Sequence, residues 1–182
     1  MAAFAERIHI TSRGQAIDML MAKKDKKDIV ISDYIKLVEE TTGYNIGLNL
    51  KIGGIASGLE EEKVNCLFKF GFNLGTLAQI RDDVLDYCDA KLDGQYIIGK
   101  LPFRDTETNK KRLPLLLTKD SILRKLPSSV YDKIEGDFIA PRRKEAKRQL
   151  EEAKIDPESK QLFERILDYW SDIQLFQKLS SG

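Results

Sequence analysis

The chain has 182 residues, 42% of them apolar and 32% charged, a length that predicts one domain. Thirty Lys and Arg against 29 Asp and Glu give a formal charge of +1, so the long-range attraction to phosphates that nucleic-acid binders need is absent. Two cysteines and one histidine are too few for a disulfide scaffold or a structural zinc site. No apolar run reaches the roughly 18 residues that span a bilayer, and a secretory signal is not visible. We therefore expect a cytoplasmic protein with reduced thiols, no nucleic-acid partner and no transmembrane segment.

Long stretches rich in Leu, Ile, Lys, Glu and Ala, with only five prolines and 12 glycines, predict a single all-helical domain over residues 1–182 and no β-sheet. In chain order, the apolar spacing predicts helices over residues 2–21, 34–49, 59–87, 113–117, 142–153 and 159–179. The charge run at residues 23–28 is expected to be a solvated loop.

Capping and breaking residues set the expected helix ends. Ser32 or Asp33 is expected to cap the second helix, and the hydroxyl of Ser57 the third. Asp156 is expected to cap the last helix. The expected helix breaks are Gly53, Gly54, Gly58, Pro127 and Pro141. Trp170 and Phe176 are predicted to pack in the core, since aromatic residues at helical spacing usually do.

The strongest chemical signal is an acidic run, Gln79-Ile-Arg-Asp82-Asp83-Val-Leu-Asp86-Tyr87, near the end of the third predicted helix. Asp82 and Asp86 are four residues apart and share one helical face, where like charges repel and also oppose the helix dipole. A cation between them would relieve this cost, and hard carboxylate oxygens suit Mg²⁺, which bridges carboxylates to phosphates. The alternative interpretation is a solvated acidic helix end, balanced by Arg81 or Lys91.

Basic and polar residues elsewhere support the first interpretation. Lys100 and Lys110 follow the acidic helix across a glycine-containing loop and are suitable point charges for a diphosphate. Upstream, Gln15 and Asp18 lie three residues apart on one face of another helix. Taken alone, the run around Lys110 is an exposed basic loop. Taken together, these residues predict a clamp for magnesium and a diphosphate.

The residues from Gly71 to Tyr87 resemble, without a gap, the helix with the second aspartate-rich motif of the trans-isoprenyl diphosphate synthases, also called polyprenyl synthetases. The following loop and helix of that family are matched in order by Gly99-Lys100, Asp105, Lys110 and Leu113-Pro-Leu-Leu-Leu. Gly14-Gln15-x-x-Asp18 matches the family's Gly-Gln-x-x-Asp helix. The resemblance covers about residues 10–118. It implies an all-α isoprenoid synthase bundle that condenses an allylic diphosphate with isopentenyl diphosphate, using Mg²⁺.

The resemblance also assigns roles to individual residues. It implies that Asp82 binds Mg²⁺ directly, that Asp83 and Asp86 support the metal through water, and that Asp18 joins the metal or its waters. The residues implied to hold the diphosphate are Lys100 and Lys110. The residues implied to line the cavity and steady the developing carbocation are Gln79, Gln15 and Thr42.

Two departures from the family pattern limit what the resemblance implies. The chain carries only the later of the family's two aspartate-rich motifs, so it matches the C-terminal half of the bundle, and the family's earlier helices have no counterpart. Thr41 stands where the family has a lysine, which removes one diphosphate contact. An open cavity cannot exclude water from a carbocation, and half a bundle leaves apolar faces uncovered.

Three origins of this half bundle stay open. The chain is either one product of a split gene whose other half supplies the first motif, a diverged subunit that binds a complete synthase, or a piece of a longer protein. We therefore expect a second protein chain or a homo-oligomer as partner. The leading hypothesis is a component of a prenyl diphosphate synthase that is not competent alone. The rivals are a non-catalytic regulatory or scaffold subunit and, less well supported, a generic helical interaction module.

Overall fold

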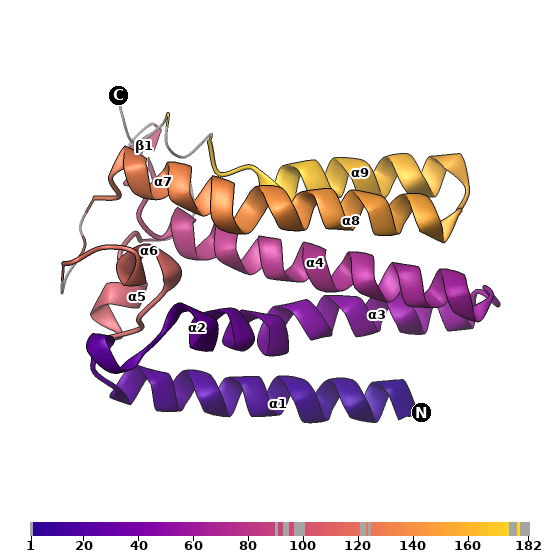
Figure 1. Cartoon of the computed structure of the whole chain (residues 1–182), viewed down its shortest axis with the longest axis horizontal. Helices are drawn as coiled ribbons and strands as arrows, with labels where there is room; N and C mark the ends of the chain where they lie inside the picture. The colour runs from indigo at the N-terminus through magenta and orange to yellow at the C-terminus, as the bar shows by residue number, and fades with distance from the viewer. Residues whose placement is uncertain are drawn as a thin grey trace.

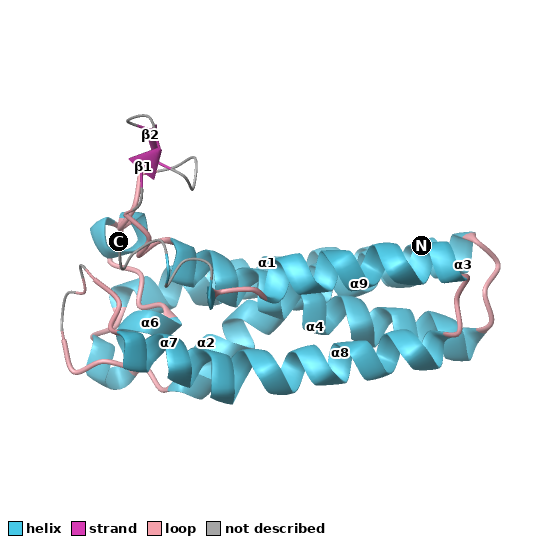
Figure 2. Ribbon diagram, turned by 90° about the horizontal axis from the view of Figure 1, so that it is seen from above, coloured by secondary structure: helices cyan, strands magenta, loops and turns pink. Residues whose placement is uncertain are grey.

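A computed structural model describes residues 2–89, 91–92, 95–96, 101–120, 123, 125–174 and 178. These residues form a helical bundle in which the long helices lie side by side (Figure 1). The predicted all-α class is confirmed, with one exception. Strands β1 (Lys91–Leu92) and β2 (Gln95–Tyr96) pair antiparallel, with Lys91 opposite Tyr96, so the prediction of no β-sheet is wrong. A ladder of two residues per strand is too short to produce a readable alternation in the sequence. This hairpin projects from one end of the bundle (Figure 2).

The first half of the chain forms two antiparallel helical arms. Helix α1 (Ala2–Lys23) is the first arm. The second arm begins with α2 (Ile31–Val38), continues through a wide π-helical turn (Glu39–Gly43) and ends with α3 (Tyr44–Ala56). The arm passes through Gly53 and ends at Gly58, which has φ +70°, so only the last of the three expected glycine stops is correct. Gly58 takes the left-handed conformation that glycine adopts without strain.

The turn between α1 and α2 is more structured than the expected solvated loop. A short 3₁₀ turn covers Lys26–Asp28. The Nζ of Lys26 donates a hydrogen bond to the carbonyl of Thr118, at 2.7 Å. At the start of α2, the carboxylate of Asp33 accepts from the backbone N–H of Val30 at 3.4 Å, so Asp33 supports the helix start from its first turn and does not occupy the capping position itself. Through Lys26, the charged turn after the first arm is tied to the segment at Thr118.

Helix α4 (Glu61–Leu85) runs through the centre of the bundle and packs against α3, α8 and α9. Its close approach to the second arm depends on two small residues, Gly71 and Gly75. A Cβ at Gly75 would lie 2.4 Å from the carbonyl oxygen of Thr42, closer than any real side chain can be. The predicted hydroxyl cap from Ser57 is wrong, because the helix begins after Glu60, and no side chain caps it.

The second half of the chain returns along α4. Two short helices, α5 (Arg104–Glu107) and α6 (Leu113–Leu116), sit at the end of the bundle where α1 ends and α2 begins (Figure 1). The chain then enters α7 (Ser128–Ile134), a second π-helical turn (Glu135–Ile139) and α8 (Ala140–Ala153). Pro141 therefore does not break the helix, because the wide turn just before it accommodates the missing N–H.

Helix α9 (Pro157–Ser171) is the last long helix of the described residues. The Oδ1 of Asp156 accepts from the backbone N–H of Ser159 at 2.9 Å, which confirms the predicted cap. The helix ends earlier than predicted, and Phe176 lies outside the described residues. Cys66 and Cys88 are both free thiols. Within the described ranges, no helix combines the length and apolar character needed to cross a membrane.

Candidate functional site

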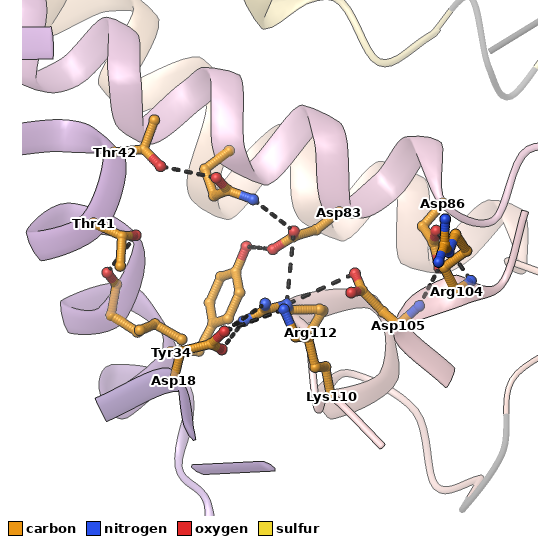
Figure 3. Close-up of polar contacts among 12 residues, drawn as sticks. Asp18, Tyr34, Thr41, Thr42, Asp83, Asp86, Arg104, Asp105, Lys110 and Arg112 are labelled. Carbon is orange, nitrogen blue, oxygen red and sulfur yellow. Dashed lines mark hydrogen bonds and ion pairs between the residues drawn. The ribbon is translucent and has the colours of Figure 1, made fainter. Parts of the chain in front are cut away.

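The predicted site residues that the structure describes gather toward the end of the bundle where α1 and α4 end, α2 begins and the segment 101–120 folds back (Figure 1). At its centre lies Arg112, which is 8% exposed. Its guanidinium donates to both carboxylate oxygens of Asp18 on α1, at 2.7 and 3.4 Å. Its Nε lies 3.9 Å from Oδ1 of Asp83 on α4 and 3.7 Å from Oδ2 of Asp105 on α5 (Figure 3). One arginine thus joins three carboxylates from three helices.

Charge on these groups follows from this arrangement. Burial acts to lower the pKa of Arg112, but Asp83 and Asp18 outweigh it, so the pKa is raised and the guanidinium stays charged. Burial acts to raise the pKa of Asp18, but bonds from Arg112 and Lys110 hold the pKa below its ordinary value. The Nζ of Lys110 lies 3.2 Å from Oδ2 of Asp18. Asp18 is therefore an ionised partner of two cations.

Asp83 is turned into the protein and is 1% exposed. The hydroxyl of Tyr34 donates to its Oδ2 at 2.6 Å, and the amide of Gln79 donates to its Oδ1 at 3.0 Å. Burial is the largest influence on this carboxyl and raises its pKa to about 7, against the opposing effects of Arg112, Tyr34 and Gln79. Because its oxygens already accept from protein donors, Asp83 acts here as a buried structural group.

Asp86 has a different local role at the end of α4. Its side chain is 1% exposed, and its oxygens accept from the backbone N–H groups of Arg104 at 3.3 Å and Asp105 at 3.1 Å. Its own carbonyl accepts from the N–H of Phe103 at 2.7 Å. Carboxylates at a helix N-terminus satisfy backbone donors that would otherwise lack partners. Asp86 thus anchors the start of α5, which carries Asp105 toward Arg112.

Asp82 points away from Arg112, to a pocket of about 420 Å³ between the second arm, α4 and α9 that it helps to line. The other lining residues are Thr42, Ile46, Leu74, Gly75, Ala78, Gln79, Ile166 and Trp170. We call this the apolar pocket. Trp170 is 38% exposed and lies over Arg81, with 5.4 Å between the guanidinium carbon and the ring centroid. The prediction that Trp170 is a core residue is therefore wrong, because α9 ends there and its last turn lies at the rim of a pocket.

A smaller pocket of about 180 Å³ lies on the other side of Thr42 and Gln79. We call it the polar pocket. Its lining residues are Gln15, Asp18, Leu37, Val38, Thr41, Thr42, Gln79, Lys110 and Arg112. The hydroxyl of Thr42 donates to Oε1 of Gln79 at 2.8 Å, and these two residues line both pockets. The hydroxyl of Thr41 is turned back to the carbonyl of Leu37, at 2.8 Å.

Seven of the predicted site residues therefore lie around two adjoining pockets or directly behind them, and Asp86 lies beyond, under α5. Lys100 lies outside the described residues. The predicted metal ligands do not converge on one point. Asp82 and Asp18 line different pockets, while Asp83 and Asp86 accept from protein donors. Across the part of the chain that the structure describes, no group of three or more His, Cys, Asp or Glu side chains is arranged to hold a metal ion.

Mg²⁺ therefore fits this donor set only in part. Mg²⁺ usually keeps several waters and is held by one or two carboxylates together with substrate phosphates. Asp82, at the wall of a pocket and beside Gln79, suits such a site. Asp83, Asp86 and Asp18 each accept from protein donors that would have to move before these carboxylates could hold the ion.

Sequence reasoning missed Arg112 and Tyr34. The run around Lys110, which by itself predicts an exposed basic loop, includes Arg112, yet Arg112 is almost fully buried. The available signal was Leu113-Pro-Leu-Leu-Leu directly after it, because a buried helix start pulls the preceding residue into the protein. Tyr34 gave no signal, since a phenol on an apolar helix face normally belongs to the core.

Comparison of the sequence with known proteins identifies its family and its relatives. The family model described as polyprenyl synthetase matches residues 1–136. A geranylfarnesyl diphosphate synthase of Aeropyrum pernix is 28% identical over 183 residues, which cover 87% of this chain and 55% of that protein. A nonaprenyl diphosphate synthase of Mycobacterium tuberculosis is 40% identical over 86 residues, 47% of this chain and 24% of that protein. The chain thus spans just over half the length of the first relative and a quarter of the second.

Solved structures show the same fold. A crystal structure of a geranylgeranyl pyrophosphate synthase superposes with a TM-score of 0.74 at 22% identity, over 93% of this chain and 59% of that one. A polyprenyl synthetase of Streptomyces coelicolor gives 0.73 at 18% identity, over 94% and 58%. The described bundle is therefore an isoprenoid synthase fold that corresponds to somewhat more than half of these structures. The family match covers well over half of the chain, which belongs to the polyprenyl synthetase family.

Proposed function

We propose that this chain is a component of a prenyl diphosphate synthase that condenses an allylic diphosphate with isopentenyl diphosphate. The observation that carries the proposal is the pair of adjoining pockets, one polar and one apolar, joined at Thr42 and Gln79. An isoprenyl diphosphate has a charged head and a hydrocarbon tail, and needs two such environments side by side.

The polar pocket suits the head group. Lys110 lies at this pocket with its side chain 35% exposed, and a lysine ammonium is a suitable point charge for a phosphate oxygen. Gln15 and Thr41 add polar side chains to the same wall. The apolar pocket suits the tail, because Ile46, Leu74 and Ile166 give it a hydrocarbon wall.

We place Mg²⁺, which the family resemblance implies, at Asp82. When bound there with water and a substrate phosphate, it would offset the negative charge of the departing diphosphate. Asp82 would hold the metal from the apolar-pocket side, and Lys110 would hold the diphosphate from the polar-pocket side.

The chain's own residues would orient the reacting group and protect it. Thr42 donates to Gln79, and Gln79 donates to Asp83, so the amide of Gln79 is fixed with its oxygen toward Thr42 and the pockets. A fixed carbonyl dipole stabilises positive charge that develops in front of it. The apolar wall keeps water away from such a cation.

A second protein chain would complete the cavity. Four large apolar side chains of α1 are 50–69% exposed: Phe4, Ile8, Met19 and Leu20. Three of them, Phe4, Ile8 and Met19, share one helical face with Gln15 of the polar pocket, because positions 4, 8, 15 and 19 differ by multiples of a turn. We call Phe4, Ile8 and Met19 the α1 stripe. A partner that covers the α1 stripe would also close the polar pocket, and we expect no turnover without it.

The test is an activity assay on the assembled protein. The chain is purified alone and co-purified from its own cells, the native mass of each preparation is measured, and prenyl transfer from isopentenyl diphosphate is assayed. We expect turnover from the co-purified assembly, lost in Asp82→Ala and retained in Lys23→Ala, an exposed control on α1. Equal turnover in the wild type and Asp82→Ala would contradict the metal role.

Ligand binding to the isolated chain gives a second, independent test. Trp170 is the sole tryptophan and lines the apolar pocket, so its fluorescence reports on that pocket. We expect farnesyl diphosphate to change the emission and inorganic diphosphate to leave it nearly unchanged. An identical response to both ligands would show that the tail does not enter this pocket.

The second candidate function is a non-catalytic regulatory or scaffold subunit of a heteromeric synthase. It is favoured by the internal hydrogen bonds of the predicted metal-binding acids Asp18, Asp83 and Asp86, and by Thr41 in place of a lysine. The same assembly assay separates the two functions. A scaffold would raise the turnover of its partner while Asp82→Ala left that turnover unchanged.

A further inference from the structure

The guanidinium of Arg112 lies among carboxylates from three helices, α1, α4 and α5 (Figure 3). It makes a two-pronged contact with Asp18 through Nη1 and Nη2, which fixes the plane of the group. This plane leaves Nε directed toward Asp83 and Asp105, at 3.9 and 3.7 Å. Nε is buried and makes no hydrogen bond within the described residues. Its contribution to these two acids is therefore electrostatic.

We propose that Arg112 is a built-in cation of the acidic centre, which holds the position between Asp18 and Asp83 that a divalent metal ion would need in order to bridge them. The contacts of Arg112 do not depend on the proposed function. The consequence for catalysis does rest on it: Arg112 keeps Asp83 from a metal shared with Asp18, whereas Asp82 lines the apolar pocket.

Space and charge both support this assignment. A magnesium ion bonds oxygen at about 2.0–2.1 Å and retains waters, whereas the guanidinium already fills the gap between Asp18 and Asp83. Arg112 and Lys110 together face Asp18, Asp83 and Asp105, so at most one negative charge is uncompensated. A buried group of carboxylates needs compensating cations to be stable, and here the chain supplies them itself.

The arrangement also makes Arg112 a positioning residue for Lys110. Both side chains converge on Asp18, and Arg112 directly precedes the buried helix α6. The contact with Asp18 therefore ties the segment that carries Lys110 to α1, at the wall of the polar pocket. A lysine at position 112 would keep the charge but could not reach Asp18 with two prongs while facing Asp83.

The experiment uses the full chain and Mn²⁺ as the probe, at pH 8. Thermal unfolding is followed with and without millimolar Mn²⁺ for the wild type, Asp83→Asn, Arg112→Gln, Arg112→Lys and the double variant Arg112→Gln/Asp83→Asn. Bound Mn²⁺ is measured in parallel by electron paramagnetic resonance.

We expect the Tm of the wild type not to respond to Mn²⁺ through Asp83, so that the single variant Asp83→Asn responds to Mn²⁺ as the wild type does. Arg112→Gln should lower the Tm by on the order of 10 °C, because an unpaired buried charge remains. Mn²⁺ should restore part of this loss and bind at one additional site. The double variant should lose both the restoration and the additional site. If Arg112→Gln does not fold, Arg112→Lys should fold with a Tm below that of the wild type and still bind no additional Mn²⁺.

Three results would overturn the proposal: an unchanged Tm in Arg112→Gln, a lowered Tm that Mn²⁺ does not raise, or Mn²⁺ binding by the wild type that Asp83→Asn removes. None of these depends on prenyl diphosphates. A failure of farnesyl diphosphate to bind or react would count against the proposed function and leave this result standing.

Discussion

Adjacent acids on one helix have opposite surroundings in this protein. Successive residues of an α-helix point about 100° apart, so Asp83 is turned to Tyr34 and Arg112 while Asp82 is turned to the apolar pocket. Asp86 follows by almost one turn, but its side chain is engaged by the N-terminus of α5. The three carboxylates of one motif thus have three roles. Asp82 lines a pocket, Asp83 faces a buried cation, and Asp86 accepts from the N–H groups at a helix start.

The hydrogen bond between Tyr34 and Asp83 gives the first prediction. Tyr34 is fully buried, and its hydroxyl donates to Asp83 at 2.6 Å. Tyr34→Phe keeps the ring but removes a donor to a buried carboxylate, which should lower the free energy of unfolding by about 1.5–3 kcal/mol. Chemical denaturation measures it. Tyr169→Phe is the matched control, since that side chain is 61% exposed, and its stability should stay within about 0.5 kcal/mol of the wild type.

The helix-capping role of Asp86 gives the second prediction. Asp86→Ala removes the acceptor for two backbone N–H groups of α5, so we expect a loss of about 1 kcal/mol in the free energy of unfolding. Asp82→Ala removes a like-charged neighbour at the pocket wall and should leave stability unchanged or slightly raised. Urea titrations of the two variants, side by side, check this. Equal losses in both would mean that the two acids do not differ in structural role.

At this scale the sequence predicted which residues gather but not how they pair. Gln15, Asp18, Thr42, Gln79 and Lys110 do line adjoining pockets. Spacing alone could not show that the cation facing two of the acids is a side chain, because Arg112 is distant in sequence from Asp18 and is brought to it only by the fold. Pairing of this kind depends on tertiary contacts that a local pattern does not contain.

At the scale of elements, α4 is held against the second arm by glycines. A side chain at Gly75 would collide with the Thr42 carbonyl, at 2.4 Å, and with Ile46, at 3.0 Å. Both neighbours are on the second arm, and both line the apolar pocket. The closeness of these two helices therefore sets the width of that pocket.

This packing gives the third prediction. Gly75→Ala should lower the free energy of unfolding by about 1–3 kcal/mol, because the second arm must move away from α4. Gly53→Ala, also in a helix but with open space around the new Cβ, should raise it by up to about 1 kcal/mol, since alanine is the better helix former. Thermal and urea unfolding of the pair show whether the signs are opposite. Equal effects at both positions would rule out a close contact at Gly75.

The sequence predicted the long helices well and their joints poorly. The apolar spacing predicted a helix over residues 59–87, and α4 covers Glu61–Leu85, so both ends are correct to within two residues. The predicted helix break at Pro141 is wrong, because a proline that directly follows a wide turn does not interrupt the helix. The spacing of apolar residues did not predict that turn. Helix ends without a capping side chain, such as the start of α4, are likewise set by packing.

At the scale of the whole molecule, the chain spans 55% of the Aeropyrum pernix relative and superposes on 59% of a geranylgeranyl pyrophosphate synthase structure. In the described part, α1 is an outer helix of the bundle (Figure 1). It packs on the second arm by one side and carries the α1 stripe of Phe4, Ile8 and Met19 on another. Large exposed apolar side chains in a row are typical of a surface that another protein covers.

The α1 stripe gives the last prediction. Ile8→Glu and Met19→Glu together place two charges where an apolar partner would pack, and both side chains are at least half exposed in the chain alone, so its Tm should not fall. We expect the wild type to have a native mass above its 20.8 kDa, by itself or with a chain co-purified from its cells, and the double variant to elute as a monomer without turnover. His9→Glu, exposed on another face of α1, should retain both mass and turnover. If the double variant keeps the assembly, the partner packs elsewhere. If the wild type is a monomer that turns over alone, the described bundle closes its own cavity, because water must be excluded from the carbocation in either case.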